Sequence, residues 1–289
     1  MKNTNLHSAR KSKNDEFYTQ YKDIEKEIAH YKDHFYGKSI YCNCDDPAHS
    51  NFWKYFVDNF YDLNLSKVVC TYLGEESYVT EYDGIGESRR RLMGDGDFRS
   101  SECVDLLREA DIVVTNPPFS LFREYIAQLM EYDKKFLVVG HQNAITYKEI
   151  FPSIKENKIW LGHGFTGNAA HFIAPYYNDI ALATDHREGM IRVSGVVWYT
   201  NINQNKHNEK LILSEYYYGN ENAYPRYDNY DAIEVSHTKN IPVDYDAPMG
   251  VPITFLTKHN PLQFNIIDAL NVPVIYGNRI YKRIIIIRK

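Results

Sequence analysis

Short apolar runs alternate with segments of helical periodicity along the first half of the chain. The runs that predict buried strands span residues 38–43, 67–72, 111–115 and 135–139. Apolar residues recur at helical spacing over 50–61 and 120–130, where Ser50 and Ser120 are the predicted N-caps. Strands that alternate with helices in this way predict an α/β fold with a doubly wound, mostly parallel sheet that helices cover on both faces.

The second half of the chain differs in composition. Residues 214–246 hold seven tyrosines, seven acidic residues and only two basic ones, whereas residues 279–289 hold five basic residues and no acidic one. Helical and strand periodicity is harder to follow here than in the first half. We therefore predict a boundary near residue 203, with a larger domain at 1–202 and a smaller C-terminal region with closing strands at 203–289.

Charge and composition exclude several classes of protein. The chain has 33 Lys and Arg against 38 Asp and Glu, which argues against nucleic-acid binding through bulk positive charge. No apolar stretch approaches the ~18 residues that a membrane span needs, and the N-terminus lacks the apolar core of a signal peptide. The four cysteines and 11 histidines show no metal-site spacing. We expect a cytoplasmic protein with reduced thiols, no metal ion and no membrane contact.

The sharpest chemical signal is Asn116-Pro117-Pro118-Phe119, directly after the strand predicted at 111–115. In parallel α/β folds, ligands bind beyond the carboxyl ends of the strands. An exocyclic amine on a nucleobase is a poor nucleophile, because its lone pair is delocalised into the ring. The Asn116 side-chain oxygen and the Pro117 carbonyl can accept from its two N–H bonds and expose the lone pair, on a backbone that the prolines hold rigid. Phe119 offers a face on which a planar ring can stack.

This tetrapeptide resembles the catalytic motif of S-adenosylmethionine-dependent amino methyltransferases, in the Asn-first form of the enzymes that methylate N6 of adenine. Further segments, in order along nearly the whole chain, resemble the EcoRI-type adenine-specific DNA methyltransferases. They are Asp15–Gln20, Cys44–Pro47 with Ser50–Phe52, Gly94–Phe98, Trp198–Asn201, Tyr227–Asp231, and Val251–Leu256 through Asn260–Phe264. The Gly-rich first loop of general cofactor folds is missing, as it is in this branch, and only Gly37 precedes the first strand.

The resemblance implies a methyltransferase-type sheet in a catalytic, cofactor-binding domain at 1–202 and a target-recognition region at 203–289. It also implies S-adenosylmethionine as cofactor and double-stranded DNA as substrate, for an enzyme that works as a monomer. The enzyme would act alone or beside a cognate restriction endonuclease that shares its site. Because N6 of adenine is paired in a duplex, the target base would have to rotate out of the stack into the pocket.

The resemblance assigns roles to individual residues. Asn116, Pro117, Pro118 and Phe119 would hold the target adenine. Asp45 and Asp46 would hold the amino-acid end and the ribose of the cofactor. The resemblance does not say which of the two carboxylates holds which group. Asp97 would accept from the cofactor's adenine amine, and Phe98 would pack on its ring. The residues that would close over the methionine portion are Phe17, Tyr18 and Thr19.

An acidic chain needs basic patches to approach phosphates, and three are visible in the sequence, at residues 2–13, 89–91 and 279–289. The predicted nucleic-acid contacts are Arg89, Arg90, Arg91, Arg279, Lys282 and Arg283. Arg89–Arg91 stand just before the Gly94 loop, so we place them at a strand edge near the cofactor. A charge run is by default a solvated face, and the sequence alone does not separate the two interpretations.

Other interpretations remain open at this point. The same chemistry could act on RNA adenine or on a protein glutamine amide, for which similar tetrapeptides are used. A non-catalytic DNA-binding module could keep the fold, although an intact Asn-Pro-Pro-Phe argues against that. Asn-Pro-Pro alone could be a turn after a strand, and Asp45-Asp46-Pro47 alone could be a solvated turn before the Ser50 helix.

Overall fold

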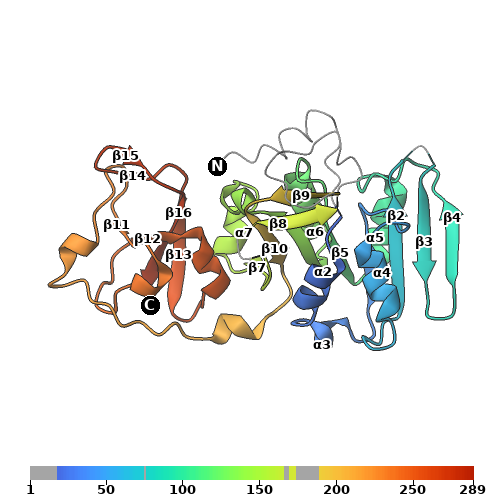
Figure 1. Ribbon diagram of the computed structural model, residues 1–289, viewed down its shortest axis with the longest axis horizontal. Coiled ribbons are helices and arrows are strands. Elements are labelled where there is room, and N and C mark those ends of the chain that lie inside the picture. The colour runs from blue at the N-terminus through green and yellow to red at the C-terminus, as the bar shows by residue number, and fades with distance from the viewer. Residues whose placement is uncertain (1–17, 75, 166–168, 174–188) are drawn as a thin grey trace. The chain divides into compact units, whose positions relative to one another are not determined.

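The computed structural model describes residues 18–74, 76–165, 169–173 and 189–289 (Figure 1). The chain divides into two compact units, one of residues 1–144 with 161–202 and the other of residues 145–160 with 203–289. One division lies between residues 202 and 203, and the segment 145–160 packs with the C-terminal residues. The assignment of a catalytic domain to 1–202 and a target-recognition region to 203–289 stays a prediction.

The N-terminal unit is built on an eight-stranded sheet in the order β4-β3-β2-β1-β5-β6-β10-β7. In that order the strands are Glu87–Arg91, Tyr78–Tyr82, Lys67–Tyr72, Ser39–Cys42, Ile112–Thr115, Lys135–His141, Val196–Thr200 and Trp160–Leu161. The central strands β2, β1, β5 and β6 are parallel, whereas β3 and β4 form an antiparallel hairpin at one edge and β10 runs antiparallel to β6. Figure 1 shows the β3–β4 hairpin at the end of the sheet. The predicted mostly parallel α/β sheet is confirmed.

Helices cover both faces of this sheet. Among the residues that the structure describes, the helices of the N-terminal unit are α2 (Tyr21–Ile28), α3 (Lys32–Phe35), α4 (Asn51–Asp58), α5 (Ser101–Glu109) and α6 (Phe122–Glu131). Side chains alternate between the faces of a strand, so Ile40 and Tyr41 of β1 point to opposite sides. Ile40 belongs to the main apolar core with residues of α2 and α4. On the other face, Phe122 of α6 packs on Tyr199 of β10, with ring centroids 5.0 Å apart.

A separate two-stranded antiparallel sheet in this unit joins β8 (Ala170–Ile173) to β9 (Met190–Val193), and Tyr18 adds a bridge to Ile173. Within the described ranges, no helix is both long and apolar enough to cross a membrane.

The two predicted helix caps have different outcomes. Ser50 caps α4, since its hydroxyl accepts from the backbone N–H groups of Phe52 and Trp53 at 3.1 and 3.2 Å. The prediction that Ser120 caps α6 is wrong. The N-cap of α6 is Leu121, without a side-chain hydrogen bond, and its N–H donates to the carbonyl of Pro118 at 3.0 Å. The residues after the prolines form a turn that delays the start of the helix.

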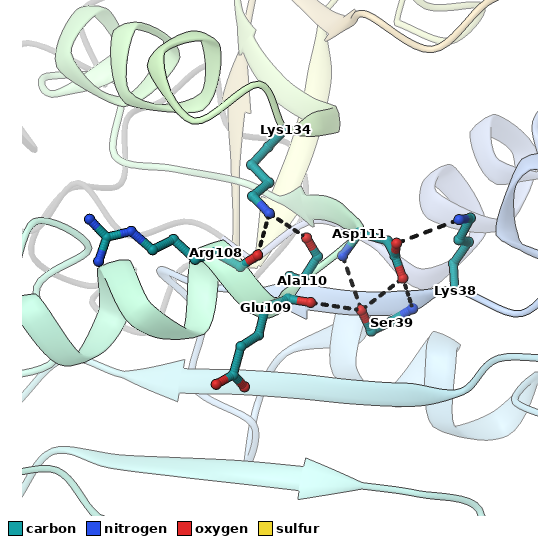
Figure 2. Close-up of polar contacts among 7 residues, drawn as sticks. All are labelled: Lys38, Ser39, Arg108, Glu109, Ala110, Asp111 and Lys134. Carbon is teal, nitrogen blue, oxygen red and sulfur yellow. Dashed lines mark hydrogen bonds and ion pairs between the residues drawn. The ribbon is translucent and has the colours of Figure 1, made fainter.

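Polar contacts hold the N-terminal ends of β1, β5 and β6 in place (Figure 2). These ends lie opposite the loops that follow the strands. The Asp111 carboxylate, just before β5, accepts from the backbone N–H and the hydroxyl of Ser39, the first residue of β1, at 2.9 and 3.0 Å. Lys134, just before β6, donates from Nζ to the carbonyls of Arg108 and Ala110 at 2.6 and 2.8 Å. A cation at these carbonyls also complements the C-terminal end of the α5 dipole.

The C-terminal unit contains a four-stranded sheet in the order β11-β12-β16-β13 and the hairpin β14–β15. The strands β11 to β16 are Ile233–Glu234, Met249–Pro252, Phe264–Leu270, Val274–Ile275, Asn278–Arg279 and Arg283–Arg288. The unit also has the helix α7 (Phe151–Lys155) and short 3₁₀ turns. These turns span Asn205–Asn208, Glu221–Ala223, Thr238–Asn240 and Ile253–Lys258, and a further one, Gln142–Thr146, crosses between the units. The Ile run of the C-terminus forms the buried centre of β16.

Two buried histidines hold residues 145–160 to the rest of this unit. The ring of His207 stacks on Trp160 with centroids 3.8 Å apart, and Nε2 of His259 lies 3.0 Å from Oδ1 of Asn157. Burial lowers the pKa of both imidazoles to about 4, helped by the charges of Lys206 near His207 and Lys289 near His259. Both rings are therefore neutral at pH 7.

This burial predicts that the C-terminal unit loses stability in acid. An unfolded histidine binds a proton below its ordinary pKa of about 6.5, while these two do so in the folded state only near pH 4. The free energy of unfolding should therefore fall as the pH drops from 6.5 to 4, by up to about 3 kcal/mol per histidine. In urea titrations across this range, His207→Phe should keep the stack on Trp160 and lose part of the pH dependence. An unchanged pH dependence in this variant would contradict the assignment.

Candidate active site

A pocket opens at the carboxyl ends of the parallel strands in the N-terminal unit. It is partly open to solvent and combines polar with apolar lining residues. Its lining residues are Tyr18, Cys44, Asp45, Asp46, Tyr72, Leu73, Gly96, Asp97, Phe98, Asn116, Pro118 and Leu121. They come from the loops that follow β1, β2, β4 and β5 and from the chain just before α2.

The structure brings most of the predicted site residues together in this pocket. Those that line it are Tyr18, Asp45, Asp46, Asp97, Phe98, Asn116 and Pro118. Pro117 and Thr19 are buried and adjoin lining residues in the chain. Phe119 is half-buried and packs against the main apolar core. Phe17 lies outside the described residues. The segments that hold Tyr18, Asp45, Asp97 and Asn116, which are distant in the sequence, therefore meet at one edge of the sheet.

The loop after β1 turns sharply so that consecutive residues reach the pocket. Cys44 adopts a left-handed backbone with φ of 63°, which is uncommon for a residue with a Cβ and follows directly from this reversal. The Asp45 carboxylate is buried, and its Oδ2 lies 2.7 Å from the hydroxyl of Thr115, the last residue of β5. The same hydroxyl contacts the carbonyl of Asn43. The loop after β1 is thus tied to the strand that carries Asn116.

Asp46 is held by a different set of donors. Its Oδ1 accepts from the backbone N–H of Ala48 at 2.9 Å and from the hydroxyl of Tyr78 at 3.0 Å, and its Oδ2 lies 2.9 Å from Nδ1 of His49. Burial alone would raise the pKa of this carboxyl, but the hydrogen bonds from His49, Ala48 and Tyr78 outweigh it and lower the pKa. Asp46 is therefore an anion that both lines the pocket and fixes the turn leading into α4.

The loop after β4 approaches the end of β2 very closely. Gly96 is buried with φ of +81°, and an added Cβ would overlap the carbonyl oxygen of Tyr72. Only glycine fits this position. The close approach places Asp97 and Phe98 against the pocket, and Phe98 also packs edge-on against Tyr125 of α6 with centroids 5.1 Å apart. The paired guanidinium of Arg99 holds the pKa of Asp97 below its usual range.

Several lining residues carry no clear signal in the sequence. Tyr72 ends β2 and Leu73 follows it, without a recognisable motif, and Leu121 lies in the turn before α6. Tyr78 reaches Asp46 only because β3 folds back antiparallel on β2, opposite Tyr72. Gly96 is the exception, because it lies within Gly94–Phe98, one of the segments on which the family resemblance rests.

The basic residues predicted to contact nucleic acid have different environments. Arg89, Arg90 and Arg91 lie on β4, the edge strand of the sheet. Arg90 pairs with Glu102 of α5 at 3.0 Å, so its charge is already matched. Arg89 and Arg91 point to the opposite face, where they line a hollow with Tyr78, and the guanidinium carbon of Arg89 lies 4.4 Å from the centre of the Tyr78 ring.

The three C-terminal basic residues also differ. Arg279 is exposed on β15. Lys282 donates to the hydroxyl of Thr146 at 2.8 Å, and its burial lowers its pKa. Arg283 forms an ion pair with Glu234 at 2.6 Å, and both side chains are largely buried. Its guanidinium is therefore already paired with a carboxylate inside the C-terminal unit.

The site has the chemical features that a nucleoside and a second planar ring would need. Carboxylates at Asp45, Asp46 and Asp97 can accept from ammonium, hydroxyl and amine groups, while the apolar surfaces of Phe98 and Leu121 can cover ring faces. Asn116 and Pro118 line the same pocket. Acceptor groups and apolar surfaces thus surround one cavity.

Comparisons with known proteins agree with this arrangement. The model of the family described as "Adenine-specific methyltransferase EcoRI" matches residues 5–90 and 77–286. The chain is 49% identical to the Type II methyltransferase M.EcoRI of Escherichia coli, over 91% of this chain and 88% of that protein.

It is 41% identical to the Type II methyltransferase M.MpnI of Mycoplasma pneumoniae and 39% identical to M.MgeORF184P of Mycoplasma genitalium, in each case over 92% of this chain and at least 85% of the relative. No solved structure gives a match. The family model and these relatives each span most of the chain, so the chain belongs to the family of EcoRI adenine-specific methyltransferases.

Proposed function

We propose that this protein transfers a methyl group from S-adenosylmethionine to N6 of an adenine rotated out of duplex DNA, as the methyltransferase of a restriction–modification system. The observation that carries the proposal is the shared pocket, in which Asn116 and Pro118 face the same space as Asp45, Asp46 and Asp97. The family supplies the adenine specificity. The names of the relatives, Type II methyltransferases, supply the link to DNA modification.

Each part of the pocket has a role in cofactor binding. Asp45 and Asp46, after β1, would accept from the ammonium and the ribose hydroxyls of the cofactor. Asp97 would accept from its adenine amine, and Phe98 would pack on the adenine ring. Tyr18 and the buried Thr19 would close over the methionine end. When bound, the cofactor supplies a methyl group on a positively charged sulfur, and the adjacent carboxylates favour binding of that charge.

Asn116 and Pro117 would act on the target base. The Asn116 side-chain oxygen and the Pro117 carbonyl accept from the two N–H bonds of the adenine amine and hold its nitrogen toward the methyl group. As the N–C bond forms, the bond between the methyl carbon and the cofactor's sulfur would break, with S-adenosylhomocysteine as the leaving group. The amine becomes positively charged, and the same two oxygens stabilise that charge before a proton leaves for solvent. Phe119 would stack on the adenine ring, and Pro118 would keep the backbone rigid.

The DNA would approach through basic residues outside the pocket. Arg89 and Arg91 share one face of the edge strand, and Arg91 has no ion-pair partner among the residues that the structure describes. We assign phosphate contacts to Arg91 and to Arg89, whose pair with Glu87 of the same strand is long, at 3.5 Å, and half exposed. Arg279, which is exposed, and Lys282 are assigned phosphate contacts as well. Arg90 and Arg283 already form ion pairs with Glu102 and Glu234, so we assign them a structural role and no phosphate contact. The protein would act as a monomer in the cytoplasm, beside a nuclease of the same specificity.

The first prediction concerns the target side of the pocket. Asn116→Ala removes an acceptor that acts only on the transferring amine, so methyl transfer to DNA should fall by about 10²–10³-fold. Binding of S-adenosylhomocysteine, measured by calorimetry, should be nearly unchanged. Ser120→Ala, in the exposed turn after the motif, is the control and should retain activity. Full transfer by the Asn116 variant would contradict the role proposed for the motif.

The second prediction concerns the edge strand. Arg91→Ala should weaken binding to duplex DNA and reduce the slope of log affinity against log salt concentration by about 1, because one phosphate contact is lost. Arg90→Ala is the matched control, since Arg90 belongs to the same strand but pairs with Glu102 on the opposite face. Equal salt slopes for the wild type and the Arg91 variant would show that this face does not contact DNA.

A further inference from the structure

The Asp97 carboxylate has an unusually complete set of donors for a residue that lines the pocket. Its Oδ1 accepts from the backbone N–H and from Nε of Arg99, both at 2.8 Å, and its Oδ2 accepts from Nη2 of Arg99 at 2.7 Å. This is the parallel, two-bond pairing in which Arg is geometrically specific. A carboxylate oxygen has about two acceptor sites. Oδ1 thus has both sites filled by described residues, whereas Oδ2 keeps one.

Arg99 is in turn held from its far side. Its Nη1 donates to Oε2 of Glu124 at 2.8 Å, and its guanidinium carbon lies 5.1 Å from the centre of the Phe98 ring. Glu124 stands in the first turn of α6, the helix that follows Asn116–Phe119. Gln128 of the same helix donates to the carbonyl of Phe98 at 3.1 Å. The side chain of Arg99 therefore spans from the loop after β4 to the helix behind the target-base motif.

We propose that Arg99 is a positioning residue for the adenine of the cofactor, because it fixes the Asp97 carboxylate in the orientation that accepts from the 6-amino group and ties this loop to α6. The inference rests on the proposed function, since it takes the pocket to be the S-adenosylmethionine site. The free acceptor site on Asp97 Oδ2 selects an amine over a carbonyl at position 6. Without Arg99, the carboxylate can rotate toward solvent, and this selection weakens.

Surface ion pairs contribute little in general, and Arg99 and Glu124 are each about half exposed. The Asp97 pairing differs because it is bidentate, its carboxylate is only 20% exposed, and its backbone is held by the close approach of Gly96 to β2. We therefore expect the Asp97–Arg99 pair to affect the selectivity for the cofactor's 6-amino group more than the overall stability of the protein.

The test compares the binding of two cofactor products by calorimetry: S-adenosylhomocysteine and S-inosylhomocysteine, in which a carbonyl replaces the 6-amino group. The wild type should prefer the adenine form by roughly 10- to 100-fold, the ratio expected for one hydrogen bond to a charged group. In Arg99→Gln the preference should fall to within a few-fold. Arg99→Lys should be intermediate, because Lys keeps the charge and loses the planar fork.

Two further variants give the test its controls. Arg108→Gln makes the same chemical change at a surface arginine of α5 that pairs with Asp105, near the opposite edge of the sheet, and should keep the wild-type preference. Glu124→Gln should lower the preference in the same direction as Arg99→Gln but by less. It also keeps the proposal testable if the Arg99 variants do not fold.

The kinetic readout separates positioning from general damage. Arg99→Gln should raise the KM for S-adenosylmethionine and leave kcat close to that of the wild type, because the target-base motif is untouched. A wild-type preference in the folded Arg99 and Glu124 variants would overturn the inference while leaving the proposed function intact. Failure of the wild type to bind either product would instead overturn the proposed cofactor site.

Discussion

The parallel pairing of β1 with β5 is the constraint on which the rest of the site depends. Ile40 lies opposite Ile112 and Tyr41 opposite Val113, so the loops after the two strands leave the sheet side by side. The fully buried hydroxyl of Thr115 joins these loops, because it lies within hydrogen-bond distance of both the Asn43 carbonyl and the Asp45 carboxylate. The pocket acids and the target-base motif are neighbours for this reason.

Further long-range contacts hold the walls of the pocket in place. Two of them hold the loop after β1. Tyr125 of α6 donates to the side chain of Asn43, and Tyr78 of the edge hairpin donates to Asp46. Gly96 lets the next loop pack directly on the end of β2. Each contact joins a pocket loop to a rigid strand or helix, which is how a binding site gains precision. The antiparallel hairpin thus supports the cofactor side of the pocket as well as extending the sheet.

The sequence predicted the central strands and the ligand-binding edge, because buried parallel strands are continuous apolar runs and the Asn-Pro-Pro-Phe motif follows one of them. Periodicity gave no sign of β4, whose Glu-Ser-Arg-Arg-Arg sequence is exposed throughout. Only the position of Arg89–Arg91 before the Gly94 loop pointed to a strand edge. The pairing of Asp97 with Arg99 is local, yet its orientation depends on Gly96 meeting Tyr72 across the fold. The cap at Ser120 was wrong because the turn after the prolines displaced the helix start. The packing of residues 145–160 with the C-terminal unit could not be predicted, because nothing in their sequence indicates contact with the distant His207 and His259.

Hydrogen exchange with and without S-adenosylhomocysteine tests the central claim, that loops after β1, β4 and β5 form one cofactor pocket. We expect the backbone amides at residues 43–46 and 96–98 to exchange more slowly together when the ligand is present, with residues 203–289 little affected. Slowing confined to residues 203–289, or slowing at only one of the two loops, would contradict it.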